Sequence, residues 1–142
     1  MARSVWLRRT LLPCAVAVTA VVMQASSASA GTWSNKINAG WGQMEGYISH
    51  GSSSNTGCSY AKVNSTYASR LHDNDAGDGH GVVGYLMYTD CATGKIKHKI
   101  IGEAHYGGTV GLSTSPVYNA KLPRFMLCRS SQDGGKWIGC ET

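Results

Sequence analysis

The stretch "VVGYLMYTDCATGKIKHKI", residues 82–100, decides the fold class of this chain. Its first eight residues are apolar on both faces of an extended chain, which is typical of a central buried strand. Its last six residues alternate with the period of two that a strand has. Gly94 suits the left-handed position of a short turn between them, so we predict an antiparallel hairpin. The alternation directs Ile96, His98 and Ile100 at the core. It directs Lys95, Lys97 and Lys99 at solvent.

Similar short runs, bounded by glycine, asparagine and serine, recur along the chain, and no window shows a sustained helical period. We therefore predict an all-β fold, a small antiparallel sandwich or barrel of about seven short strands. The expected strands cover residues 44–49, 59–67, 82–90, 95–106, 109–112, 124–129 and 136–140.

Residues 1–30 have the parts of a secretory signal peptide: three arginines, an apolar run over residues 11–23, and an Ala-x-Ala site ending at Ala30. That run is shorter than the roughly twenty residues of a membrane span, so no span is expected. We expect residues 31–142 to form a single secreted, extracellular β domain. Its ten Lys and Arg against eight Asp and Glu reduce the formal charge from +5 to +2, so net charge does not indicate nucleic-acid binding.

Four cysteines lie in this expected domain, and an even number in an exported chain indicates two disulfides. If the turn of the last hairpin centres on Gly134, the numbers of opposed residues sum to 268, which pairs Cys128 with Cys140. Directly opposed residues lie about 4.5 or 5.5 Å apart at Cα, within disulfide range. We therefore favour Cys128–Cys140 and Cys58–Cys91, although a two-residue turn would shift the register and spoil this pairing.

The segment "HDNDAGDGHG", residues 72–81, is either a metal site or a polar loop. It departs from the calcium-loop template at three positions, but Asp73, Asp75 and Asp78 could still converge on calcium in an irregular loop. Zinc held by His72 and His80 would lack a third ligand. We favour a solvated loop and expect no cofactor, with calcium as the alternative.

The lysine row at Lys95, Lys97 and Lys99 repeats about every 6.8 Å along its strand, a spacing that could bind an anionic polymer. Lysines on an exposed strand also prevent edge-to-edge pairing without any ligand. Further along, Glu103 and His105 share the lysine face if no bulge intervenes at Gly102. A glutamate, a histidine and cations on one face could act in RNA transesterification, so a small secreted hydrolase such as a ribonuclease is an alternative function.

Aromatic residues divide between core and surface, because Phe125 is the only phenylalanine of the chain. We expect Trp137 to be buried beside the terminal disulfide, and Trp33 or Trp41 to be available for a ligand. Together these features favour a disulfide-bonded binding module that recognises an extracellular protein or glycan, without catalysis. Affinity would reside in residues 51–57 and 72–81 or in the exposed tryptophans, and a secreted antibacterial toxin is a further alternative.

Overall fold

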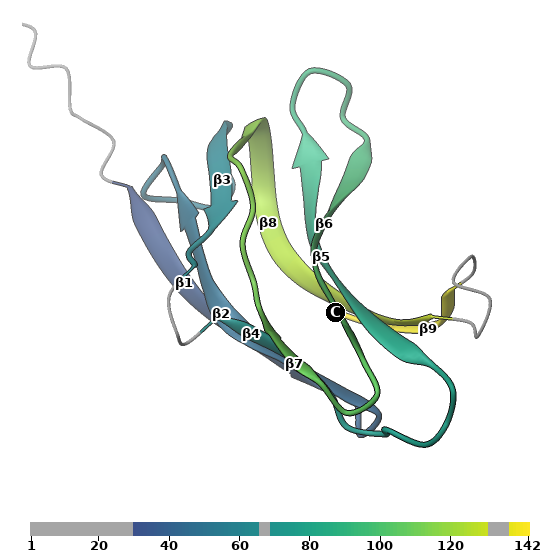
Figure 1. Cartoon of the computed structure of the whole chain (residues 1–142). Coiled ribbons are helices and arrows are strands. Elements are labelled where there is room, and N and C mark those ends of the chain that lie inside the picture. The colour runs from purple at the N-terminus through teal and green to yellow at the C-terminus, as the bar shows by residue number, and fades with distance from the viewer. Residues whose placement is uncertain (1–29, 66–68, 131–136) are drawn as a thin grey trace, which may run out of the picture.

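The computed structural model describes residues 30–65, 69–130 and 137–142. These described residues form nine strands and no helix (Figure 1). The strands are β1 (Gly31–Asn38), β2 (Gly42–His50), β3 (Ser59–Val63), β4 (Arg70–Asp73), β5 (Gly81–Asp90), β6 (Ile96–His105), β7 (Thr109–Gly111), β8 (Val117–Ser130) and β9 (Trp137–Glu141).

All nine strands belong to one antiparallel sheet that curls into a half-barrel (Figure 1). Its order is β6-β5-β8-β3-β2-β4-β7, with β1 beside β2 and β9 beside β8. The segment after β7 joins the two ends of this order. The Leu112 N–H donates to the Ser69 carbonyl at 2.8 Å, and the Ser113 N–H donates to the Ile101 carbonyl at 3.2 Å.

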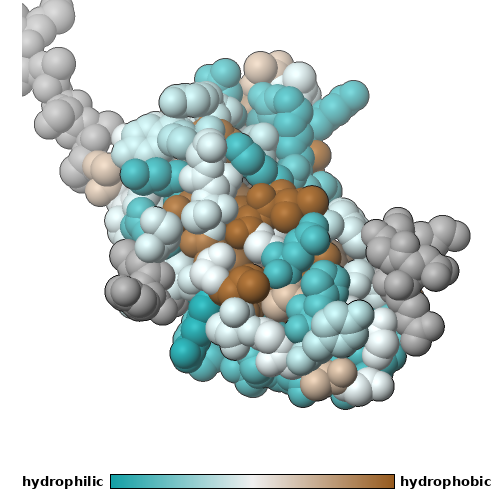
Figure 2. All heavy atoms as spheres, in the orientation of Figure 1, coloured by the Kyte–Doolittle hydropathy of each residue, from teal (hydrophilic) through white to brown (hydrophobic). Residues whose placement is uncertain are grey.

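The main core fills the inner face of the curled sheet. Alternate side chains of most strands point into it, as the two-residue period of a strand requires. In the space-filling view, hydrophobic side chains gather over the middle of the visible face, near β8 and β6, among hydrophilic ones (Figure 2). The largest fully buried side chains of this core are those of Phe125, Met44, Ile48, Leu71, Leu86, Leu112 and Leu127.

The strand β5 is buried on both faces, as the sequence predicts. It lies between β6 and β8 in the sheet. Val82 and Leu86 belong to the main core, whereas Val83, Tyr85 and Met87 form a second buried cluster on the opposite, outer face. An apolar outer face on a central strand requires cover.

The β5–β6 hairpin, the antiparallel pairing of β8 with β9 and both predicted disulfides are confirmed, whereas the predicted turn at Gly134 lies outside the described residues. Gly94 has a φ of +68° in the β5–β6 turn, the left-handed conformation that glycine adopts without cost. In the last hairpin Cys128 pairs with Cys140, the register that sums to 268, and the two Cα atoms lie 4.1 Å apart. The second bridge joins Cys58 to Cys91.

The structure has two strands that the sequence analysis did not expect, β1 and β4. In β1 only Ile37 is buried, so the strand carries little apolar alternation, and β4 has only four residues. The last long strand also begins earlier than expected, at Val117 rather than Arg124, because two irregular residues interrupt its pattern. Asn119 and Leu122 have φ values of +54° and +53°.

A β-bulge in β6 reverses the expected faces of this strand. Gly84 pairs with Gly102, whereas the next residue, Tyr85, pairs with Ile100, so Ile101 is an extra residue on β6. The condition under which Glu103 and His105 would share the lysine face, a strand without a bulge near Gly102, is therefore not met.

The same bulge explains a second correction, at Ile96, His98 and Ile100, which were expected in the core. These three side chains are exposed, with 58% of Ile96 and 53% of Ile100 accessible. Ile101 and Ala104 point inward at and after the bulge. The bulge changes the alternation, so before it the inward positions of β6 are those of the lysines. The isoleucines and His98 thus lie on the outer face, opposite Tyr85 and its neighbours.

Candidate functional site

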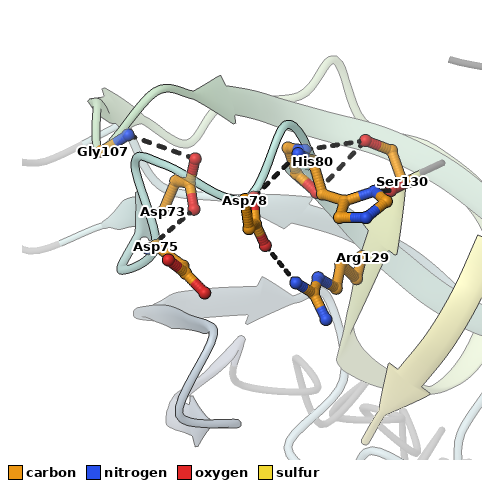
Figure 3. A network of polar contacts seen from close by, with 8 residues as sticks. Asp73, Asp75, Asp78, His80, Gly107, Arg129 and Ser130 are labelled. Carbon is orange, nitrogen blue, oxygen red and sulfur yellow. Dashed lines mark hydrogen bonds and ion pairs between the residues drawn. The ribbon is translucent and has the colours of Figure 1, made fainter. Parts of the chain in front are cut away.

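The carboxylates of Asp73 and Asp78, in the segment 72–81, bond to the protein itself (Figure 3). Asp73 is buried at the end of β4, where one carboxylate oxygen accepts the Asp75 N–H at 3.1 Å. The other accepts the Gly107 N–H at 3.2 Å, which fastens this loop to the β6–β7 turn.

At the other end of this loop, Asp78 accepts the His80 N–H at 2.7 Å and forms an ion pair with Arg129 of β8. The hydrogen bond from His80 and the charge of Arg129 hold the pKa of the Asp78 carboxyl below its ordinary value. A ring nitrogen of His80 lies 2.9 Å from the Ser130 carbonyl oxygen (Figure 3).

Within the described part of the chain, no three His, Cys, Asp or Glu side chains gather in a way that could hold a metal ion. The calcium alternative at Asp73, Asp75 and Asp78 is therefore not supported by the geometry, because the first and last of these carboxylates bond in different directions. His72 lies on β4 and hydrogen-bonds Thr109 at 2.7 Å. The segment is a loop fastened by its own carboxylates.

Two members of the lysine row also have partners within the protein. Lys97 forms an ion pair with Asp90, which lowers the pKa of the Asp90 carboxyl and raises that of the Lys97 ammonium. Lys99 donates to the Ser115 carbonyl at 3.4 Å. Lys95 is exposed just before β6. Binding of a polyanion by this row stays a prediction, and it would require Lys97 to leave its carboxylate.

The remaining predicted residues lie in different surroundings. Glu103 and His105 are exposed on the outer face, opposite Val83 and Gly81, and neither lines any of the three hollows described below. Catalysis by this pair stays a prediction.

The two candidate tryptophans are each half-buried. The Trp33 ring lies 5.8 Å from the ring of the buried His50, and Trp41 packs against the main core. A ligand at either tryptophan stays a prediction.

The outer face of β5, β6 and β8 has the most distinctive surface among the described residues. Cross-strand partners share a face, so the pairing register places these side chains side by side in rows across the three strands. We call this surface the apolar face; it consists of Val83, Tyr85, Met87, Ile96, His98, Ile100, Arg124, Met126 and Cys128, with Trp137 of β9 beside it.

An aromatic cluster occupies the β9 end of the apolar face. The Trp137 indole N–H donates to the Tyr85 hydroxyl oxygen at 2.9 Å, and the two ring centroids lie 4.9 Å apart. The His98 ring lies edge-on to Trp137 at 5.7 Å. Burial raises the pKa of the Tyr85 phenol, and the negative charge of Glu103 raises it further.

Trp137 is not buried, contrary to the prediction, because 49% of its surface is accessible. It covers Tyr85 from outside, where no further layer of the described chain lies over it. The indole therefore packs on Tyr85 of the outer buried cluster with one part of its surface and leaves the rest accessible to solvent.

A hollow of about 390 Å³ lies where β5 and β8 separate, toward the opposite end of the apolar face. Met87 pairs with Arg124, and Thr89 pairs with Lys121. Between these pairs β5 has one residue and β8 has two, Leu122 and Pro123, so β8 forms a β-bulge there. Proline is compatible with such a bulge because it has no N–H to donate. The hollow is lined by Asn55, Met87, Tyr88, Thr89, Ile96, Leu122, Pro123 and Arg124.

The segment 51–57 supplies one wall of this hollow and is fixed there. The Leu122 N–H donates to the Asn55 carbonyl, and the bridge of Cys58 to Cys91 joins the end of the segment to the β5–β6 turn. The Cys91 N–H in turn donates to the Asn119 carbonyl at 2.7 Å. The wall is thus held to β8 by one hydrogen bond and to the turn by the disulfide, and the turn is itself held to β8 by a second hydrogen bond.

Sequence reasoning included the segment 51–57 among the binding loops but did not find the hollow beside it. The hollow depends on Leu122 and its positive φ, which no residue pattern indicates for a leucine. The outer position of Ile96 and Ile100 depends on the bulge at Ile101. Of the signals that were available, the one that pointed here was the apolar character of both faces of residues 82–89.

Comparisons of the chain with protein-family models, with curated proteins and with solved structures found no match.

The disulfides fit an extracellular protein, since such bonds persist in oxidising compartments. No helix of the described residues is long and apolar enough to cross a membrane.

Proposed function

We propose that this chain is a secreted binding module that recognises another protein through the apolar face. The observation that carries the proposal is that the central strands β5 and β8 are apolar on both sides of the sheet, and that exposed apolar side chains adjoin their outer side. Ile96, Ile100 and Trp137 leave about half of their surfaces accessible on the second side. Exposed apolar side chains that adjoin one another mark interaction sites.

The composition of the apolar face favours a protein partner. Aromatic residues, methionine and arginine are enriched in protein interfaces, whereas lysine and carboxylates are depleted from their centres. The face has Tyr85, Trp137, two methionines and Arg124, and the lysines of β6 point to the inner side. The carboxylate of Glu103 lies at its edge, opposite Val83. Methionine also adapts its shape to a partner surface.

Arg124 adds a charge to one end of this surface. It is exposed beside the hollow, and among the described residues no carboxylate forms an ion pair with it. A guanidinium binds a carboxylate with two parallel hydrogen bonds. The partner segment that fits best therefore places an apolar side chain in the hollow and a carboxylate next to it.

The segment 51–57 and the signal-peptide pattern support the same function. A pocket wall fixed by a disulfide loses little freedom on binding, which favours affinity. Export would place the module where both bridges form and where extracellular proteins are available.

The test begins with the oxidised protein over residues 31–142, immobilised and exposed to secreted and surface proteins of the cells that make it. A captured partner is purified and titrated by calorimetry against the native chain and against Ile100→Asp and Arg124→Glu. We expect these two substitutions to weaken binding roughly tenfold or more, as changes at interface hot spots do.

Tyr118→Asp and Lys62→Glu are the matched controls, because both residues are exposed on strands and outside the apolar face. They should leave the affinity unchanged. The proposal fails if the two control variants lose as much affinity as the two variants of the apolar face, or if the latter bind as tightly as the native chain.

A further inference from the structure

The other end of the sheet has an outer surface of opposite character. On β1, β2, β4 and β7, the outward positions are almost entirely polar, and the register places them in rows across the strands. We call this surface the polar face; it consists of Ser34, Lys36, Gln43, Glu45, Tyr47, Arg70, His72 and Thr109.

Two shallow hollows lie on the polar face, on either side of one ion-paired glutamate. The first, of about 360 Å³, lies over β1 and β2 and reaches from Ser34 to Tyr47. The second, of about 250 Å³, is lined by Gln43, Arg70, His72 and Thr109. From Gln43 to Tyr47 the strand advances about 14 Å, so the two hollows form one elongated surface along β2.

The polar face has two cations and one carboxylate, and both cations contact that carboxylate. Arg70 lies 2.6 Å from one oxygen of the Glu45 carboxylate, and Lys36 lies 3.6 Å from the other. Both cations of the face thus share one carboxylate. A polyanion requires several cations free to contact phosphate or sulfate groups, and this surface does not provide them.

The hydrogen-bonding groups of the polar face are held in position. A ring nitrogen of His72 lies 2.7 Å from the Thr109 hydroxyl, which fixes the ring beside the second hollow. Arg70 is fixed by its two contacts with Glu45. Fixed hydroxyl, imidazole and guanidinium groups can exchange hydrogen bonds with sugar hydroxyls at little cost in side-chain entropy.

Tyr47 provides the apolar contact that such a ligand requires. It lines the first hollow with 40% of its surface exposed, and it is the one large hydrophobic side chain of this face. An aromatic ring can pack against the C–H side of a sugar ring, whereas a protein partner would require several apolar anchors. We infer that the polar face binds a neutral oligosaccharide along β2, with one ring on Tyr47 and others beside Gln43 and His72.

This inference is independent of the protein partner proposed above, because the two surfaces share no residue. The test is an NMR titration of the isotopically labelled, oxidised protein with soluble cello-, manno- and chito-oligosaccharides. Heparin is added separately as a polyanion. We expect saturable shifts of the backbone amides of Gln43, Tyr47 and His72 with at least one neutral series.

Tyr47→Ala and His72→Ala should each weaken that binding roughly tenfold, the effect of losing one good contact. Tyr118→Ala is the matched control, since Tyr118 is an exposed strand tyrosine outside both hollows, and it should bind as the native chain does. Amide spectra of each variant show whether it is folded.

Three outcomes would overturn the inference. In one, none of the neutral series shifts these amides up to millimolar concentration. In another, heparin alone does so. In the third, Tyr118→Ala weakens sugar binding as much as Tyr47→Ala.

Discussion

Trp137 of the last strand donates its indole N–H to the hydroxyl oxygen of Tyr85, a residue 52 positions earlier in the chain, at 2.9 Å. Tyr85 is buried, and Trp137 is half exposed. The bond therefore joins the covered and the accessible parts of the apolar face. It also accounts for the orientation of an exposed tryptophan, which otherwise has little to fix it.

Tyr85→Phe removes the acceptor of this bond and retains the buried ring. We expect the free energy of unfolding to fall by about 0.5–1.5 kcal/mol, the usual contribution of one hydrogen bond. Urea unfolding measures the change. Tyr118→Phe is the control, because that residue is exposed and should show no loss; an equal loss in both variants would contradict the assigned role of the bond.

The two disulfides should differ in what they stabilise. In the chain-entropy account, closing the 33-residue separation of Cys58–Cys91 contributes about 4 kcal/mol, and the 12-residue separation of Cys128–Cys140 about 3 kcal/mol. We expect Cys58→Ser with Cys91→Ser to destabilise the fold more than the double substitution of the other bridge.

Binding distinguishes the two bridges further. The first bridge fixes the segment 51–57, so its removal should weaken a partner that enters the hollow by more than the loss of stability explains. Affinity is measured at a temperature where both double variants are folded. A partner affinity that depends equally on both bridges would contradict this assignment.

The sequence predicted the fold class, the central position of β5 and both disulfides, because these depend on local alternation and on one turn. Cys128 and Cys140 lie close together in sequence on two paired strands, so no distant contact is needed to oppose them, although the register shifts by one residue between Arg129 and Ser130. The faces of β6 could not be predicted in the same way. One extra residue at Ile101 exchanges inside and outside, and its placement is set by packing against β5 and the segment after β7.

The candidate site illustrates the same limit. The carboxylates of residues 72–81 suggested a calcium site as an alternative. In the structure, Asp73 and Asp78 instead bond to backbone groups and to Arg129, contacts that only the folded chain provides. The hollow depends on a leucine in a left-handed conformation, which a pattern of residue types does not reveal. Polar residues far apart in sequence, such as Glu45 and Arg70, became one surface only through strand pairing.

The backbone at Leu122 predicts that glycine is more stabilising there than alanine, the reverse of the usual order in a strand. Its φ is +53°, where a side chain with a β-carbon costs about 1–2 kcal/mol and glycine costs nothing. We expect Leu122→Gly to be more stable than Leu122→Ala by about 1 kcal/mol, since both lose the half-exposed side chain but only alanine keeps the strain. At Tyr118, an exposed strand residue without a positive φ, alanine should be the more stable of the two. Thermal unfolding of the four variants provides the measurement, and the same order at both sites would be inconsistent with strain at Leu122.

Asp78 should make stability depend on acid pH. Its pKa is held below the ordinary value of 3.8, first by the hydrogen bond from the His80 N–H and then by Arg129. A carboxyl whose pKa is lower in the folded chain stabilises that chain above the unfolded pKa, and this contribution is lost as pH falls through the folded pKa. Asp78→Asn should therefore lower the melting temperature at neutral pH, and the difference from the native chain should shrink as pH falls below about 3.8.

The matched control for this pH dependence is Asp75→Asn, because the Asp75 carboxylate has no partner among the described residues. It should change the melting temperature little at any pH. If the difference caused by Asp78→Asn stayed constant into strong acid, the ionised carboxylate would not be the stabilising group.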